Sequence, residues 1–205
     1  ECLVGSEMCI RDREKCQDPN LRSVYSIIYR NAQRILSLVN QLMDMRKLEK
    51  GQMKMKMAQT DMVSFVNNAM LPFEYLARQK RIQFRFSHPE PPVSAWIDAG
   101  NFDKVLLNIF SNAFKYTPDG GEINVSLTEV HNPSIGAPLN DSVEIRISDT
   151  GIGIAPDKLE KIFERFYRID NDITGSTAGT GIGLHLCRSL VELHHGTITA
   201  RNNTP

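Results

Sequence analysis

Two glycine pairs, each with one residue between its glycines, constrain this chain more than any other feature of its sequence. DTGIGI at 149–154 ends a hydrophobic run with an acid, and AGTGIGL at 178–184 repeats the glycine spacing and opens a helical pattern. Glycine turns let a backbone approach a flat ligand closely, and a helix N-terminus attracts phosphate. No strand leads directly into the second pair, no βαβ crossover follows it and no Walker A pattern occurs, so the sequence excludes the Rossmann and P-loop motifs. The two pairs therefore predict binding of a phosphate-bearing ligand by a motif that is neither the Rossmann motif nor the P-loop.

Periodicity along the rest of the chain predicts a mixture of helices and strands. Thr60 or Asp61 can cap a helix that runs to about Arg78, and Thr117-Pro118 stops a second helix that begins at about Asn101. We expect further helices at 156–164 and 181–194, and strands at 53–57, 82–86, 122–129, 142–148 and from 197. This order predicts an α+β fold in which a layer of helices covers a sheet.

The sequence divides into three segments. Residues 1–20 show no helical or strand period, so we expect them to be a truncation scar outside the fold. Residues 21–51 carry apolar residues every seven positions and end at Gly51, which suits the C′ position of a helix. This stripe fits either a helix packed on its own domain or a dimeric bundle, and its length favours the bundle. Residues 52–205 form the second domain; the family resemblance described below implies that it stops before its final strand and leaves an open sheet edge.

Charge and cysteine content exclude several classes of protein. Lys and Arg together number 24, as do Asp and Glu, so the zero net charge gives no support to nucleic-acid binding. The apolar stretches are too short to cross a bilayer, so we expect no direct membrane contact from this chain. The four cysteines are Cys2, Cys9, Cys16 and Cys187, and they form no C-x-x-C pair. This spacing argues against a zinc site or a disulfide framework and favours a reducing cytoplasm.

One face of the second predicted helix is polar, whereas the rest of that helix is apolar. Asn108, Asn112 and Lys115 are spaced i, i+4 and i+7, and so they share a face. A buried helix normally avoids such groups, because an unpartnered polar group costs about 1 to 3 kcal/mol. The face is therefore either a solvent-facing stripe or a site where amide oxygens bind a hard cation and the lysine binds phosphate.

The glycine stretches also allow a plain and a functional interpretation. Asp149 can be an ordinary turn acid, or it can be a carboxylate that accepts a hydrogen bond from a ring amine at the Gly151-x-Gly153 turn. In the second stretch the free N–H groups and dipole of a helix N-terminus can hold phosphate. Its residues are Gly179, Gly181 and Gly183, with the helix beginning near Leu184.

Four stretches, taken in order, closely resemble the N, G1, F and G2 boxes of bacterial sensor histidine kinases: NIFSNAFKYTP, DTGIGI, KIFERFYR and GTGIGL. These kinases belong to the GHKL ATPase superfamily, and the resemblance covers about residues 21–201. It implies a two-layer α/β sandwich of the Bergerat type that binds ATP and Mg²⁺. It also implies that residues 21–51 are the second helix of a dimerisation and phosphotransfer bundle.

The resemblance implies a role for each residue on the phosphate side of the site. Asn108 would hold Mg²⁺, Asn112 would contact the metal or the phosphates, and Lys115 would neutralise phosphate charge. Arg165 in the F box would reach the γ-phosphate. Arg165 lies between Phe163 and Phe166. These two phenylalanines either support an ATP lid or pack in the core.

On the adenine side, the resemblance implies that Asp149 accepts a hydrogen bond from the adenine amine and that Tyr116 lies beside the ring. Gly151 and Gly153 would form the adenine turn. Residues 168–180 are polar and match a mobile ATP lid. The lid and the phosphates would be anchored by Gly179, Gly181, Gly183 and Leu184.

One position bears on the reaction. Type II topoisomerases and mismatch-repair ATPases carry a glutamate where this chain has Asn108, and an amide cannot take a proton near neutral pH. The resemblance thus implies a protein histidine kinase that presents ATP to a bundle histidine, from which the phosphoryl group passes to a response-regulator aspartate. Two alternatives stay open. One is a GHKL-type ATPase or protein-serine kinase, and the other is a non-catalytic nucleotide-binding dimerisation module.

The acceptor histidine of the family has no counterpart here, because no histidine precedes His88 and none of the five lies in an acceptor motif. We therefore expect the chain to bind Mg-ATP without phosphorylating itself. The resemblance implies a homodimer through the bundle helix and a response-regulator receiver domain as partner. It implies no nucleic acid, and a cytoplasmic location within a parent protein anchored in the inner membrane.

Overall fold

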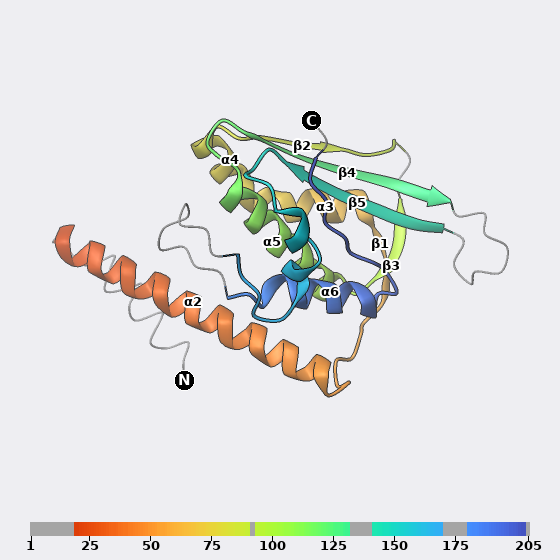
Figure 1. Ribbon diagram of the computed structural model, residues 1–205, viewed down its shortest axis with the longest axis horizontal. Helices are drawn as coiled ribbons and strands as arrows, with labels where there is room; N and C mark the ends of the chain where they lie inside the picture. The colour runs from red at the N-terminus through yellow and green to blue at the C-terminus, as the bar shows by residue number, and fades with distance from the viewer. Residues whose placement is uncertain (1–18, 91–92, 132–140, 170–179, 204–205) are drawn as a thin grey trace. The chain divides into compact units, whose positions relative to one another are not determined.

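The computed structural model describes residues 19–90, 93–131, 141–169 and 180–203, and it contains two compact units, Glu1–Met53 and Lys54–Pro205 (Figure 1). In the first unit, helix α2 spans Pro19–Glu49. Gly51 follows it with a φ of 61°. The N–H of Gly51 donates to Leu48 O at 2.9 Å, and that of Gln52 donates to Lys47 O at 2.8 Å. This Schellman pattern confirms the predicted glycine end of the helix.

The apolar side chains of α2 are largely exposed. Ile35 is 62% exposed, and Leu21, Val24, Ile28 and Leu42 of the predicted stripe are also exposed. Among the described residues, no helix is long and apolar enough to cross a bilayer.

The second unit contains two small sheets. Strands β2 (Gln83–Ser87), β4 (Glu122–His131) and β5 (Asp141–Asp149) form one sheet in the order β2-β4-β5. The β2 strand runs parallel to β4, and β5 runs antiparallel to it, with Ile123 opposite Asp149. Strands β1 (Ala58–Asp61) and β3 (Ser94–Ile97) pair antiparallel in the other sheet.

Helices cover one face of the three-stranded sheet. They are α3 (Met62–Met70), α4 (Glu74–Lys80) and α5 (Ala99–Tyr116) (Figure 1). A further helix, α6 (Gly183–Leu193), packs against α5. The sheet and its helices confirm the predicted two-layer α+β fold.

The core lies between this sheet and the helices. Along β4, Ile123, Val125 and Leu127 are buried and alternate with exposed or half-buried polar residues, as the two-residue period of a strand requires. Val125 and Leu127 cluster with Val66 and Phe110 from the helices, both 0% exposed, whereas Ile123 clusters with Phe114 of α5. Full burial of each such side chain contributes about 1.5 to 3 kcal/mol, so this layer fixes where α5 lies on the sheet.

The start of α3 has the predicted cap. Asp61 Oδ1 accepts from the N–H of Val63 at 3.0 Å, and its Oδ2 accepts from the hydroxyl of Ser64 at 2.6 Å. The hydrogen bond from Ser64 is the largest cause that holds the pKa of Asp61 below its ordinary value. Beyond Met70 the predicted single helix is divided by a short 3-10 turn, Leu71–Phe73, that contains a proline.

Three predicted elements are wrong. Residues 53–57 are not a strand, because the N–H of Lys56 donates to the carboxylate of Asp98 at 2.8 Å and the strand starts at Ala58. The predicted helix at 156–164 is two 3-10 turns, Pro156–Lys158 and Lys161–Phe163. Residues 197–203 carry no strand either, and side chains rather than a backbone ladder join them to the end of β5.

A buried junction joins the start of α5 to the end of α6. Burial works against ionisation of Asp98, but hydrogen bonds from Lys56 N, Asn101 N and the Asn101 amide outweigh it and hold its pKa below the ordinary value. The N–H of Asp98 donates to His194 Nε2 at 3.0 Å, while Nδ1 of His194 lies 2.7 Å from Leu190 O. In the middle of α6, burial raises the pKa of the Cys187 thiol to about 12.

Candidate nucleotide-binding site

Helix α5 carries the predicted polar face at the edge of the core. Asn108, Asn112 and Lys115 are half-buried, and Asn112 Nδ2 donates to Asn108 Oδ1 at 3.4 Å. Lys115 Nζ lies 3.2 Å from the hydroxyl of Tyr116 and 4.9 Å from the centre of its ring. The opposite side of the helix is held in the core by Phe110 and its neighbours, and this fixes the direction of the polar face.

The start of α6 lies directly against this face. A Cβ atom built on Gly183 would lie 2.7 Å from Asn108 Oδ1. Only a glycine allows the backbone to come this close without displacing the amide. The structure thus brings together the second glycine stretch and Asn108 of the polar face, which are far apart in the sequence.

The first glycine turn lies at the other end of α5. Asp149 Oδ1 accepts from the N–H of Gly151 at 2.8 Å. A Cβ on Gly151 would lie 2.8 Å from Tyr116 O, so this turn is also in close contact with α5. Gly153 has a φ of 69°, a left-handed conformation that favours glycine. Asp149, Gly151 and Tyr116 therefore lie together at this end of α5.

The second glycine turn is joined to the F-box segment. Gly181 has a φ of 70°, and its carbonyl accepts from the N–H of Phe166 at 2.9 Å. Phe166 has a φ of 61° and is 55% exposed, with the guanidinium of Arg165 4.8 Å from its ring centre. Phe163, by contrast, is 4% exposed and packs as a core residue.

The remaining predicted residues belong to the second glycine stretch and the lid. Leu184 is half-buried in the first turn of α6. Gly179 and most of the predicted lid, 168–180, lie outside the described residues.

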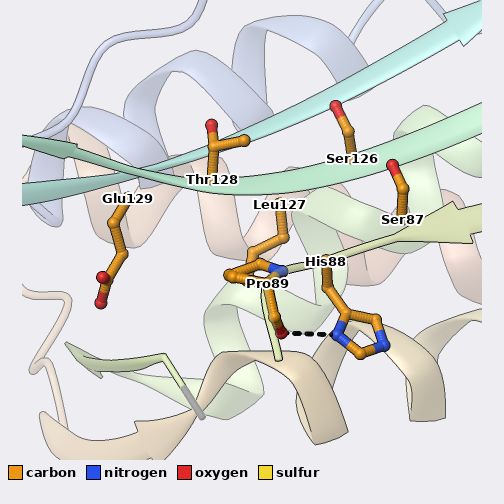
Figure 2. A pocket seen from close by; sticks show the side chains of 7 residues that line it. All are labelled: Ser87, His88, Pro89, Ser126, Leu127, Thr128 and Glu129. Atoms are coloured by element: carbon orange, nitrogen blue, oxygen red, sulfur yellow. Dashed lines mark hydrogen bonds between the residues drawn. The ribbon is translucent and has the colours of Figure 1, made fainter. Parts of the chain in front are cut away.

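A separate hollow lies beside the second half of β4 (Figure 2). His88 and Pro89 after β2 line it together with Ser126–Glu129 of β4, and His88 Nδ1 lies 2.9 Å from Pro89 O. Because Ile123, at the other end of β4, pairs with Asp149, this hollow does not belong to the predicted site.

Sequence reasoning missed two groups of residues near the site. Arg188 on α6 holds the F-box segment, with its guanidinium 4.3 Å from the ring centre of Phe163 and 3.2 Å from Glu160 Oε2. Asn202 and Asn203 contact the first glycine turn. A basic residue on an amphipathic helix and a polar segment near the end of the sequence are both common surface features, so neither gave a signal.

The family comparison agrees with this geometry. Residues 97–205 match the family described as histidine kinase-, DNA gyrase B-, and HSP90-like ATPase. The chain belongs to this family. It carries the ATP-binding domain of the GHKL superfamily in the form found in sensor histidine kinases.

Two curated relatives match nearly the whole chain. Hybrid signal transduction histidine kinase D of Dictyostelium discoideum is 38% identical over 185 residues, which are 90% of this chain and 12% of that protein. Sensor histidine kinase TmoS of Ectopseudomonas mendocina is 35% identical over 197 residues, which are 96% of this chain and 19% of that protein. The chain therefore spans a small part of the length of these relatives.

Solved structures share the fold. Full-length ShkA in complex with AMPPNP superposes with a TM-score of 0.67 at 23% identity, over 85% of this chain and 34% of that chain. Histidine kinase ThkA in complex with response regulator protein TrrA superposes with a TM-score of 0.64 at 20% identity, over 99% of this chain and 54% of that chain.

Proposed function

We propose that this chain is the ATP-binding catalytic core of a sensor histidine kinase, in which Mg-ATP is positioned for transfer of its γ-phosphoryl group to a bundle histidine. The contacts along α5 carry the proposal. Asp149 and Tyr116 lie at one end of the helix, and Asn108 and Gly183 lie toward the other. A nucleotide site needs different residues at its two ends, because the base and the phosphates require different partners.

The residues on the phosphate side fit a magnesium nucleotide. Mg²⁺ prefers oxygen ligands, and Asn108 and Asn112 offer two neighbouring amide oxygens. Within the described ranges no group of three His, Cys, Asp or Glu side chains could hold a metal, so these amides are the candidate ligands. When bound, Mg²⁺ would neutralise charge on the phosphates. Lys115 would add a positive charge beside them, and Arg165 would reach the γ-phosphate from the F-box segment.

The residues on the base side favour adenine. Asp149 uses Oδ1 to hold Gly151 and can accept a hydrogen bond from an exocyclic amine with its other oxygen. Guanine presents a carbonyl oxygen at the equivalent position, which the carboxylate would repel. Tyr116, 37% exposed, would lie beside the base. Gly151 and Gly153 would shape the turn under it, while Gly181, Gly183 and Leu184 would bind at the phosphates together with Gly179.

The phosphoryl acceptor belongs to another helix. His194 already uses both ring nitrogens, one with Asp98 N and one with Leu190 O. Asn108 cannot remove a proton from water, so the site is suited to retain ATP for a protein nucleophile. The exposed apolar stripe of α2 supports a homodimer through a helical bundle that would carry this histidine. A response-regulator receiver domain would take the phosphoryl group next, by analogy with the complex between ThkA and response regulator protein TrrA.

The remaining parts of the proposal concern the whole protein. We propose a bundle helix over 21–51, which α2 extends by two residues at its start, and a catalytic domain over 52–205. We propose a cytoplasmic location for this part of a parent protein that is anchored in the inner membrane.

Titration calorimetry with Mg-ATP and Mg-GTP tests the proposal first. We expect ATP to bind roughly 10- to 100-fold more tightly, because a hydrogen bond to a charged group contributes about 1.5 to 3 kcal/mol. The second measurement supplies a separate histidine-bearing bundle domain with labelled ATP, and we expect the label to appear on that histidine. Steady release of phosphate without an acceptor would favour a GHKL-type ATPase. Failure to bind any adenine nucleotide would favour a non-catalytic module.

A further inference from the structure

The outer side of the first glycine turn is held by two asparagines from the last described segment of the chain. Asn202 faces the main chain of Ile154: the N–H of Ile154 donates to Asn202 Oδ1 at 2.9 Å, and Asn202 Nδ2 donates to Ile154 O at 2.6 Å. Both polar groups of one residue in the turn are therefore bound by a single side-chain amide. This is the pairing that a neighbouring strand would otherwise provide.

Asn203 extends the same contact to the start of the turn. Its Nδ2 donates to Asp149 O at 2.8 Å, and its Oδ1 accepts from the hydroxyl of Ser148 at 3.2 Å. The two asparagines thus hold both ends of the Asp149–Ile154 turn. Between these ends lies Gly153, whose added Cβ would lie 3.3 Å from Asn202 Oδ1.

The other side of the turn is fixed to the sheet. The N–H of Thr150 donates to Glu122 O at 3.0 Å, and the N–H of Glu122 donates to Thr150 Oγ1 at 2.9 Å. The turn is therefore held from β4 on one side and from Asn202 and Asn203 on the other. Its tip at Ile152 is 50% exposed.

We propose that Asn202 and Asn203 are positioning residues that set the specificity of the site for the nucleobase. This inference rests on the proposed function, in which Asp149 receives the exocyclic amine. By fixing the carbonyl of Asp149 and the peptide of Ile154, the two amides hold the Asp149 carboxylate and the glycine backbone in the arrangement that accepts adenine. Neither asparagine touches the nucleotide in this arrangement.

The geometry separates this role from general stabilisation. Asn202, Asn203 and Ile152 are exposed, so water can replace the lost hydrogen bonds and the fold should persist without them. The amides lie at the base end of the site and not at Asn108 or Gly183, where the phosphates would bind. Their loss should therefore change the choice between bases more than binding of the triphosphate.

The test compares binding of Mg-ATP and Mg-GTP by calorimetry in the full 205-residue chain and in the Asn202→Ala variant. We expect ATP affinity to fall roughly tenfold, because an Asp149 carboxylate that is no longer held in place loses most of its hydrogen bond to the adenine amine, while the weaker GTP affinity stays the same. The preference for ATP should shrink by the same factor. Asn202→Ala with Asn203→Ala should shrink it further.

Two further variants make the test specific. Asn202→Asp keeps the shape and one acceptor but places a carboxylate oxygen against Ile154 O, so we expect it to lose ATP preference as Asn202→Ala does. Asn68→Ala removes an exposed amide from α3 and should leave both affinities unchanged. Urea unfolding of each variant confirms that the fold is retained.

The outcomes are distinct. If the unmodified chain binds no adenine nucleotide, the proposed function fails. If the unmodified chain prefers ATP and Asn202→Ala retains that preference, or loses ATP and GTP affinity by one common factor, the positioning role is wrong.

Discussion

The two glycine turns share a spacing in sequence but are built in opposite ways. In the first turn, the second glycine, Gly153, takes the left-handed conformation, and the first, Gly151, fits against α5. In the second turn the order is reversed: Gly181 is left-handed and Gly183 fits against Asn108. In each G-x-G pattern one glycine therefore adopts a positive φ and the other allows close packing against α5, and the order of the two glycines differs between the turns.

The two turns also differ in what holds them. Around Gly153 the first turn is held mainly by side chains, Asn202 and Asn203, although its start is also bound to the backbone of β4 through Thr150 N and Glu122 O. The second is fixed by backbone against backbone, because Gly181 lies directly on Phe166. Side chains can adjust to a substitution, whereas two fixed backbones cannot. We therefore expect a substitution of Gly181 to be tolerated less well than one of Gly153.

Gly181→Ala should have the largest effect. A Cβ there would lie 2.7 to 2.9 Å from backbone atoms of Phe166, at a φ of 70°. The strained φ costs about 1 to 2 kcal/mol and overpacking about 1 to 3 kcal/mol more. We expect calorimetry to detect no binding of Mg-ATP and the free energy of unfolding in urea to fall by at least about 2 kcal/mol.

Gly120→Ala is the matched control, because Gly120 also has a positive φ of 82° but its Cβ would meet no atom within 4 Å. It should show the strain alone and keep full ATP affinity. Equal losses in the two variants would mean that the contact between Gly181 and Phe166 has no role.

Gly183→Ala should have an intermediate effect of a different kind. Its Cβ would meet the Asn108 amide, which can rotate away, so stability should change by less than about 0.5 kcal/mol while the candidate metal ligand is displaced. We expect Mg-ATP affinity to fall roughly tenfold, by analogy with the loss of one hydrogen bond to a charged group. Affinity for adenosine, which carries no phosphate, should not change.

Gly100→Ala provides the comparison for this variant. Its Cβ would lie 3.6 Å from Asp98 Oδ1, an ordinary contact, and neither affinity should change. A Gly183→Ala chain that binds Mg-ATP normally would argue against Asn108 as a metal ligand.

These differences show how far the sequence alone could lead. The polar face of α5 and the close approach of both turns follow from spacing, since a helix period and a glycine pair are local properties. The long helix end at Gly51 and the cap at Asp61 were predictable for the same reason. Each depends on residues within one or two turns of chain.

The errors arose where distant residues decide the structure. The alternation at 53–57 predicts a strand, but Asp98, far along the chain, takes the N–H of Lys56. The segment at 156–164 has helical spacing, but its backbone forms i→i+3 bonds such as Glu164 N to Lys161 O at 2.9 Å while Phe163 is buried against Arg188. Asn202 and Asn203 gave no signal at all, because their partner is the main chain of a turn that any residue could supply.

Gly153→Ala should have the smallest effect. It tests whether backbone strain or the neighbouring atoms set the tolerance of the two turns to substitution. Its φ of 69° matches that of Gly181, but its Cβ would lie 3.3 Å from a side-chain atom, Asn202 Oδ1, which can move by the few tenths of an ångström required. The expected cost is the strain alone, about 1 to 2 kcal/mol, and Gly153→Asn should cost less because asparagine tolerates this conformation better. ATP affinity should fall less than about fivefold, measured by the same calorimetry. Since Gly153 and Gly181 share a backbone conformation, a loss as large as that of Gly181→Ala would show that strain, and not the neighbouring backbone, sets the tolerance of both turns.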